Sequence, residues 1–200
     1  DTWGAKGKGQ LGHQVGGERG GGLFERGWGR GEGETEVTLV GESARHRGQN
    51  LERCGVRCVD YRQSDISLFI QVAERMGIRW IALTDNDSRQ GKKDQKKVRG
   101  SLGTRLEAAV LFVMPEEDIE QHLCAAGFSH VYEGFLTHQT QDQITVSKTD
   151  PNYFKRLTRA VRDHKIAAVH QVLDEIRSGA PVPKLLESAI DAAIKWAEST

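Results

Sequence analysis

Two carboxylates one residue apart, Asp85 and Asp87, are the side chains of this chain whose type and spacing best suit metal-assisted chemistry. They follow the apolar run Trp80-Ile81-Ala82-Leu83, which predicts a buried strand, and precede the polar loop Ser88-Arg89-Gln90-Gly91. Ligands of open α/β sheets bind where strands end, and two acids this close repel each other unless a cation lies between them. Mg²⁺ or Mn²⁺, which prefer oxygen ligands, would suit the pair. The alternative is a solvated turn, because Asp and Asn favour turns through local hydrogen bonds.

Two further acidic clusters favour the metal interpretation. In Glu32-Gly33-Glu34-Thr35-Glu36, the side chains of Glu32 and Glu36 are four residues apart and would share one face of a helix. In Pro115-Glu116-Glu117-Asp118-Ile119-Glu120, the acids follow a second predicted strand. Each cluster is also explained as an ordinary helix start, where acidic side chains suit the helix dipole. Parallel strands bring their ends to one edge of a sheet, so acids from separate loops could gather there around divalent ions.

The elements that would position these acids alternate between strands and helices. Ser64-Asp65 makes a good N-cap for an amphipathic helix that ends at Gly77, and Pro115 stops the strand before the third acidic cluster. We expect strands at 56–60, 79–84 and 110–114, and helices at 35–47, 66–76, 91–101 and 118–126. This order predicts an α/β fold with a parallel sheet flanked by helices.

The two ends of the chain differ from this pattern. More than half of the 23 glycines lie between Gly4 and Gly33, and a segment so rich in glycine cannot bury enough apolar surface to offset its backbone entropy. Residues 1–31 are therefore predicted to be flexible or foreign to the domain. The tail predicts helices at 152–162, 165–177 and 183–198. We expect a catalytic domain over 32–145 and a C-terminal helical part of the same domain over 146–200.

Composition narrows the class of protein. The formal net charge is zero, so no global basic field indicates nucleic acid. No apolar run reaches about 18 residues, so no membrane span is expected. The three cysteines form no CxxC pair and indicate reduced thiols, which predicts a cytoplasmic protein. The sequence contains no Walker motif, so this chain is not expected to hydrolyse ATP by a phosphate loop.

A local basic strip could still bind phosphates without reading base sequence. Its cations are Lys92, Lys93, Lys96, Lys97 and Arg99. The alternative interpretation is a solvated helix face.

The acidic clusters and their neighbours resemble the Toprim domain of topoisomerases, primases and certain nucleases. That domain has a glutamate at one strand end and Asp-x-Asp at a later one. The closer resemblance is to the Toprim domain of the overcoming-lysogenization-defect (OLD) family of ATP-dependent endonucleases, and it covers about residues 32–195. The segments that carry it are 32–36, 55–59, 62–66, 85–87, 119–123, 127–128 and 131–133.

The resemblance implies a metal-dependent endonuclease with a two-ion site for Mg²⁺ or Mn²⁺. The implied metal ligands are Glu32, Glu36, Asp85, Asp87 and Glu120, and Glu32 corresponds to the general Toprim glutamate. A basic residue of the helical tail would contact the scissile phosphate: Lys165 is the first candidate and Lys148 the second. The implied substrate is nucleic acid, DNA before RNA. The family's ATPase precedes the Toprim domain, so this chain is expected to be a fragment or to act with a separate ATPase.

Some alternatives remain open at this point. Residues 23–31, just before Glu32, predict a poor strand, so the first strand of the sheet is expected to be missing or badly formed. A competing register makes 37–40 the strand and Glu42 the strand-end acid, although the spacing to Asn50-Leu51-Glu52 favours Glu32. A degenerate Toprim-like module that binds nucleic acid or a partner protein without cutting is the second functional hypothesis. A response-regulator-like or phosphatase-like domain ranks third, because no suitable lysine follows the strand at 110–114.

Overall fold

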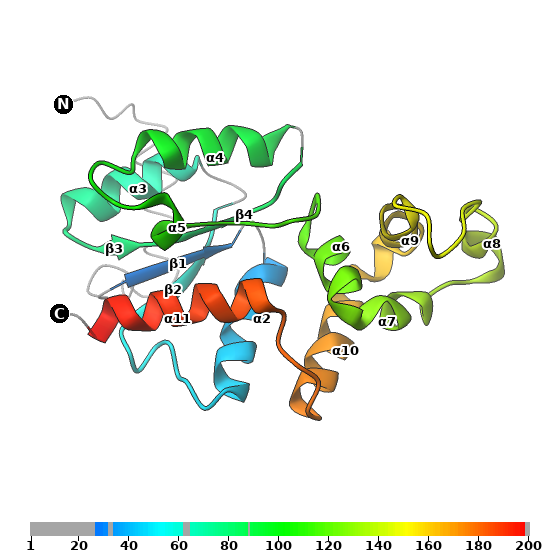
Figure 1. The fold of residues 1–200 in the computed structure, drawn as a ribbon. Coiled ribbons are helices and arrows are strands. Elements are labelled where there is room, and N and C mark those ends of the chain that lie inside the picture. Colours follow the sequence, from blue (N-terminus) through cyan, green and yellow to red (C-terminus); the bar gives the residue numbers. More distant parts are fainter. Residues whose placement is uncertain (1–26, 32–33, 62–64, 88, 199–200) are drawn as a thin grey trace.

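A computed structural model describes residues 27–31, 34–61, 65–87 and 89–198. It has a mixed α/β architecture in which every paired strand is parallel (Figure 1). The first three strands, β1 (Gly27–Gly31), β2 (Val56–Asp60) and β3 (Arg79–Trp80), form one ladder in the order β2-β1-β3. The remaining strands, β4 (Ala82–Thr84) and β5 (Leu111–Val113), pair with each other. The parallel sheet with flanking helices that the sequence predicted is confirmed.

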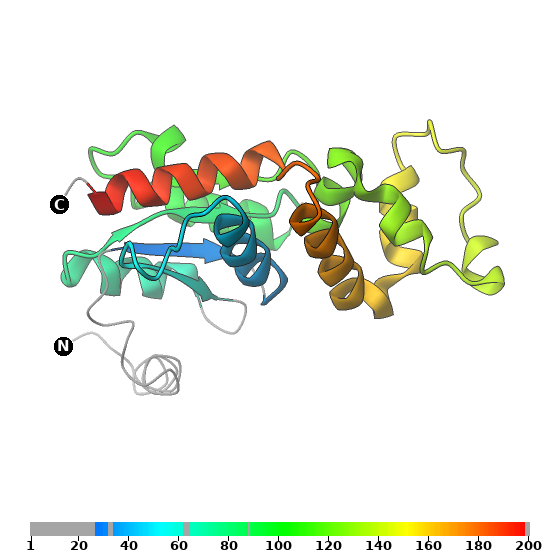
Figure 2. The same cartoon turned by 90° about the horizontal axis from the view of Figure 1, so that it is seen from below.

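Helices cover both faces of the sheet, as parallel strands require. On one face lie α3 (Ile66–Arg75), α4 (Gln90–Gly100) and the short α5 (Glu107–Val110), and on the other lie α2 (Glu34–His46) and α11 (Lys184–Glu198) (Figures 1 and 2). The segment before Asp85 shows why both faces are filled. Trp80 and Ala82 join the core under α3, whereas Ile81 and Leu83 join the core under α2 and α11. This alternation is the period of a strand buried on both sides.

The remaining helices form a separate layer beyond the carboxyl end of β1 (Figure 2). In chain order these helices are α6 (Ile119–Leu123), the π-helical turn η2 (Cys124–Phe128), α7 (Ser129–Glu133), α8 (His138–Gln141), α9 (Tyr153–Ala160), the 3₁₀ turn η3 (Arg162–His164) and α10 (Lys165–Arg177). Leu157, Val161, Ala168 and Val172 belong to the same core cluster as α2 and α11, so this layer is continuous with the sheet's core. Within the described residues, no helix is long and apolar enough to cross a bilayer.

Most local expectations are confirmed by the observed elements. Strand 56–60 is β2, and Asp65 caps α3 by accepting the N–H of Ser67 at 2.8 Å. The helices expected at 35–47, 91–101, 165–177 and 183–198 are α2, α4, α10 and α11. The competing register is wrong, because residues 37–40 are helical and Glu42 lies inside α2 rather than at a strand end.

One expectation about strands is wrong, and another is confirmed with an interruption. The glycine-rich residues 27–31 were expected to make a poor or missing strand, but they form β1, which pairs with β2 on one side and β3 on the other. Pairing on both sides satisfies the backbone of this strand, and β-propensity is easily overridden by such context. The strand expected at 79–84 is interrupted at Ile81, so that its first half pairs with β1 and its second half with β5.

Candidate active site at the carboxyl edge of the sheet

The Asp85-Asn86-Asp87 loop leaves β4 and lies under the first turn of α4. Gln95 Nε2 donates to the Asp85 carbonyl oxygen at 2.8 Å. The contact with Gly91 is closer still: a Cβ built on Gly91 would lie 2.4 Å from the Asp85 oxygen and 2.8 Å from its carbonyl carbon. Only glycine fits there without moving backbone. Gly91 therefore sets how closely α4 approaches the loop that carries both aspartates.

Asp87 takes part in the turn that follows β4. Its Oδ1 accepts the N–H of Arg89 at 2.6 Å, and its carbonyl oxygen accepts the N–H of Lys92 at 3.3 Å. This local bonding is the turn interpretation that the sequence left open. It orders the loop and occupies one carboxylate oxygen, so the turn and a ligand role for Asp87 are compatible.

The loops after β4 and β5 are joined to each other. The N–H of Asn86 donates to the carbonyl oxygen of Glu117 at 3.0 Å, and the N–H of Met114 donates to the carbonyl oxygen of Thr84 at 2.9 Å. Asn86 Nδ2 adds a longer contact of 3.4 Å to the Pro115 carbonyl. The second and third acidic segments of the sequence, 85–87 and 115–120, therefore lie side by side at one edge of the sheet.

Glu120 and Lys165 meet in this region. Glu120 is 9% exposed in the first turn of α6, and its Oε1 lies 3.1 Å from the ammonium nitrogen of Lys165, the first residue of α10. Asp118 caps α6 by accepting the N–H of Gln121 at 2.8 Å, which fixes the direction in which the helix and Glu120 leave the loop. Lys148, the second candidate, is paired instead with Glu133.

The neighbouring acids of this loop have their own partners. Glu117 accepts a hydrogen bond from Lys155 of α9, and this bond is the main reason that the pKa of Glu117 lies below its ordinary value. Glu116 Oε2 lies 2.7 Å from His122 Nδ1. Helix α9 is thereby attached to the acid-bearing edge.

Glu36 is buried in the first turn of α2, the helix that follows β1. It lines a small cavity of about 20 Å³ together with Leu83, the residue two before Asp85, and Ala193 of α11. Glu36 therefore lies just beyond the carboxyl end of β1, close to β4 and α11. Glu32, the other predicted glutamate, lies outside the described residues.

The side-chain oxygens at this edge are of the chemical type that hard divalent cations prefer as ligands. The hydroxyl Oγ1 of Thr84, next to Asp85, is fully buried and has no hydrogen-bond partner among the described residues, so the strand end carries an unused oxygen. Among the described residues, which do not include Glu32, no three His, Cys, Asp or Glu side chains lie together so that they could hold one ion.

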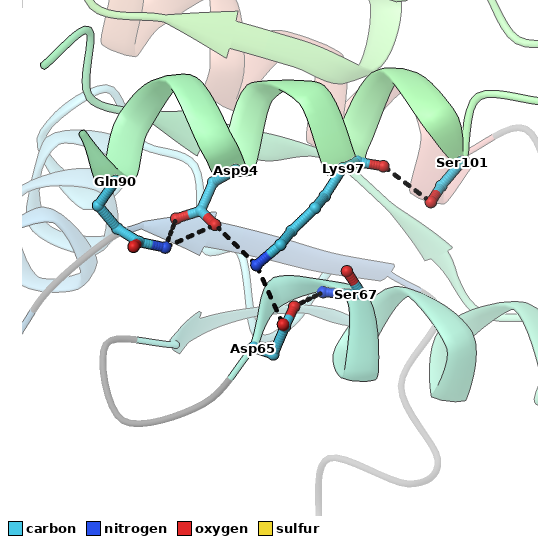
Figure 3. A network of polar contacts seen from close by, with 6 residues as sticks. All are labelled: Asp65, Ser67, Gln90, Asp94, Lys97 and Ser101. Carbon is cyan, nitrogen blue, oxygen red and sulfur yellow. Dashed lines mark hydrogen bonds and ion pairs between the residues drawn. The ribbon is translucent and has the colours of Figure 1, made fainter. Parts of the chain in front are cut away.

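The basic strip of α4 divides into two kinds of residue. Lys97 pairs with Asp65 at 3.0 Å and with the buried Asp94 at 3.6 Å, which joins α4 to the cap of α3 (Figure 3). Arg99 pairs with Glu107 at 2.9 Å. Lys92 donates to Asn86 of the aspartate loop, and Lys93 and Lys96 are exposed. Only part of the strip is therefore available to phosphates.

Sequence reasoning missed some residues of this site. Gly91 had a visible signal, since it follows Asp-x-Asp at the start of a predicted helix. Asp94 gave no local signal: it is 1% exposed in a lysine-rich helix and accepts Gln90 Nε2 at 2.9 Å (Figure 3). Lys155 was likewise indistinguishable from an ordinary helix cation.

Comparison with known proteins gives this arrangement a family context. Residues 23–87 match the family model described as the Overcoming lysogenization defect protein-like TOPRIM domain. The Escherichia coli K12 protein named Uncharacterized protein YbjD is 37% identical over 112 residues, which are 55% of this chain and 20% of that protein. The chain thus spans about a fifth of this relative's length.

Solved structures with the same fold come from two bacteria. The C-terminal region of the Burkholderia pseudomallei OLD protein superposes with a TM-score of 0.65 at 18% identity, over 87% of this chain and 99% of that one. The C-terminal region of the Xanthomonas campestris pv. campestris OLD protein gives a TM-score of 0.64 at 18% identity, over 88% of this chain and 97% of that one.

Proposed function

We propose that this chain, which carries an OLD-like Toprim domain in sequence and has the fold of the C-terminal regions of OLD proteins, cleaves phosphodiester bonds of nucleic acid with the help of divalent metal ions. The observation that carries the proposal is the meeting of Lys165 with Glu120 at 3.1 Å, beside the loop that is hydrogen-bonded to the Asp85-Asn86-Asp87 loop. These residues come from three distant parts of the sequence.

The proposed ligands of the metal ions are the carboxylates of Asp85, Asp87, Glu32, Glu36 and Glu120. Mg²⁺ or Mn²⁺ bound by them would activate a water molecule and stabilise the leaving oxygen of the cleaved ester. Carboxylates and a hydroxyl are the oxygen ligands such ions prefer. Gly91 supports this set by allowing α4 to press on the Asp85 backbone, which holds the aspartate loop in place.

Lys165 would act on the phosphate rather than on the metal. Its ammonium group is held by Glu120 at the start of α10, and the lysine side chain is 42% exposed, so it can reach a substrate while remaining oriented. A fixed cation next to the phosphate stabilises the negative charge that grows in the transition state. The Glu120–Lys165 pair would therefore link phosphate binding to the metal site.

The substrate and partner are proposed from the family context. The OLD relatives indicate nucleic acid, with DNA as the first candidate, and an ATPase domain elsewhere in full-length proteins. Because the chain covers about a fifth of the curated relative, the ATPase would lie in the rest of a longer protein or in a separate subunit.

Plasmid nicking in Mg²⁺ or Mn²⁺ tests the proposal. The wild-type chain should convert supercoiled DNA to the open circle, and Asp85→Asn should abolish this. Asp142→Asn, an exposed aspartate at the end of α8, is the matched control and should nick normally. Equal nicking by wild type and Asp85→Asn contradicts the proposal. A chain that binds DNA but never nicks it would instead be the degenerate module.

A further inference from the structure

Three arginines on α9 and η3 form no ion pair with another described residue, whereas five other arginines of the described chain do. Arg156, Arg159 and Arg162 are all exposed, and none has an ion pair or a side-chain hydrogen bond within the described part of the chain. Arginines paired with carboxylates are, by contrast, Arg45, Arg47, Arg99, Arg105 and Arg177. A row of unpaired cations is notable in a chain of zero formal net charge.

The packing of α9 explains why the row faces outward. Tyr153, Leu157 and Val161 recur every four residues and are buried against the core. Arg156 and Arg159, three residues apart, are exposed on α9 away from this buried stripe, and Arg162 is exposed in η3, the turn that follows α9. Like charges at this spacing weaken a helix. A cation in the last turn suits the helix dipole, which gives a structural reason for Arg159 but none for Arg156.

The same segment is attached to the proposed active site. Lys155, on the turn that also carries Arg156, donates to Glu117, whose carbonyl oxygen accepts the N–H of Asn86. Arg159 lies near enough to Glu117 to contribute to the lowering of its pKa. Lys165 follows Arg162 by three residues and pairs with Glu120. Figure 1 shows α9 beyond α6, on the side of the molecule that the strand ends face.

We propose that Arg156, Arg159 and Arg162 form a phosphate-binding row that holds the nucleic-acid backbone and leads it to the acidic strand ends. This inference rests on the proposed function, because it assumes that the substrate is nucleic acid. Guanidinium groups bind phosphate in bidentate fashion and stay charged at any working pH. Contacts of this kind position a backbone without reading bases. Asp163, which follows Arg162, is the only acid within the 155–165 segment.

The test measures binding of a short fluorescent DNA duplex by anisotropy, in EDTA so that no cleavage occurs. Each phosphate contact contributes roughly 0.9 to the slope of log affinity against log salt, so three lost contacts should reduce the slope by about 2.7. The triple variant Arg156→Gln, Arg159→Gln and Arg162→Gln should bind at least about tenfold more weakly at moderate salt. This loss of affinity should be similar for duplexes of unrelated base sequence.

A matched control removes three cations from the opposite edge of the sheet. Arg53 precedes β2, Arg75 ends α3, and Lys195 lies near Trp196, whose carbonyl oxygen accepts a hydrogen bond from Arg79 at the start of β3. Changing these three to Gln alters the net charge equally and should leave affinity nearly unchanged. Circular dichroism should show that both triple variants fold.

The outcomes separate this inference from the proposed function. Equal binding by wild type and the α9 variant overturns the row, even if nicking that depends on Asp85 persists. Equal losses in both triple variants also overturn it, because bulk charge would then explain the effect. Polyglutamate is a further competitor, added at the same concentration of negative charge as the DNA. If it displaces the DNA, the surface binds anions in general, and the proposed phosphate-binding row is overturned too. Specific loss in the α9 variant supports the row, even if no metal ion induces nicking.

Discussion

The backbone N–H of Asn86 donates to the carbonyl oxygen of Glu117 at 3.0 Å, and this bond joins the ends of two neighbouring parallel strands. Through it, Asp85 and Asp87 on one loop and the 115–120 acids on the other become parts of one edge. Lys155 and Lys165 reach the same edge from α9 and α10. Acids of the two strand-end segments and cations of α9 and α10 therefore meet at this edge.

Gly91→Ala should damage the aspartate loop. The added methyl group would lie 2.4 Å from the Asp85 carbonyl oxygen, and backbone must move to relieve the contact. We expect a loss of about 1–3 kcal/mol in the free energy of unfolding, as for other overpacked sites, together with loss of metal-dependent nicking. Thermal or urea unfolding with a nicking assay measures both.

Gly41→Ala is the control for this substitution. Gly41 lies in the middle of α2, and nothing lies within 4 Å of a Cβ built on it. The variant should be more stable than wild type by roughly 0.5–1 kcal/mol, because alanine loses less backbone entropy in a helix. If both substitutions stabilise the protein, the close approach of α4 to Asp85 is not a constraint.

Lys165→Ala should lower the rate of cleavage by roughly 100- to 1000-fold, the typical effect of removing one group that stabilises transition-state charge. Lys165 is partly exposed, so the fold should be retained. The decrease should be mainly in kcat, and Lys165→Arg should recover part of the wild-type kcat. Lys148→Ala, which breaks only the pair with Glu133, should cleave almost normally. The reverse ranking would exchange the roles of the two lysines.

Lys97 is expected to affect stability, whereas Lys96 is not. Lys97→Gln removes the bridge between Asp94 and Asp65 and should cost up to about 1 kcal/mol, since the lysine is partly exposed. Asp94→Ala should cost more, about 1–3 kcal/mol, because it leaves Gln90 and Lys97 without the carboxylate they bind. Lys96→Gln, on the exposed side of the same helix, is the control. Chemical denaturation compares the three variants, and equal midpoints would show that the network contributes nothing.

The Glu42–Arg177 pair should make stability depend on acid pH. The hydrogen bond from Arg177, at 2.8 Å, is the main cause that lowers the pKa of Glu42 below its ordinary value of 4.5. A carboxyl with a lowered pKa stabilises the fold above the pKa of its unfolded form, and this stabilisation is lost as pH falls through the folded pKa. Arg177→Gln should therefore be less stable than wild type at neutral pH, and the difference should shrink below pH 4.5. Arg53→Gln should show no such change, and a difference that grows in acid would contradict the assignment.

Local signals in the sequence determined much of the fold. The N-cap at Asp65, the stop at Pro115 and the apolar periodicity of 66–76 and 184–198 each depend on residues a few positions apart, which is why the order of strands and helices and the parallel sheet could be predicted. The same signals put Asp85 and Asp87 at the end of a buried strand. The Asp-x-Asp pattern with Glu32, Glu36 and Glu120 resembled one family, and the fold is that of its C-terminal regions.

Only the tertiary structure decided the contacts between distant segments. The glycine-rich residues 27–31 form the central strand because β2 and β3 pair with them on both sides, and propensity alone predicted the opposite. Lys97 was indistinguishable from its neighbours until α3 brought Asp65 to it. Glu120 and Lys165, 45 positions apart along the chain, meet because the folding of the helical layer brings the starts of α6 and α10 together. Such contacts depend on how whole layers pack, and no local pattern of residues encodes them.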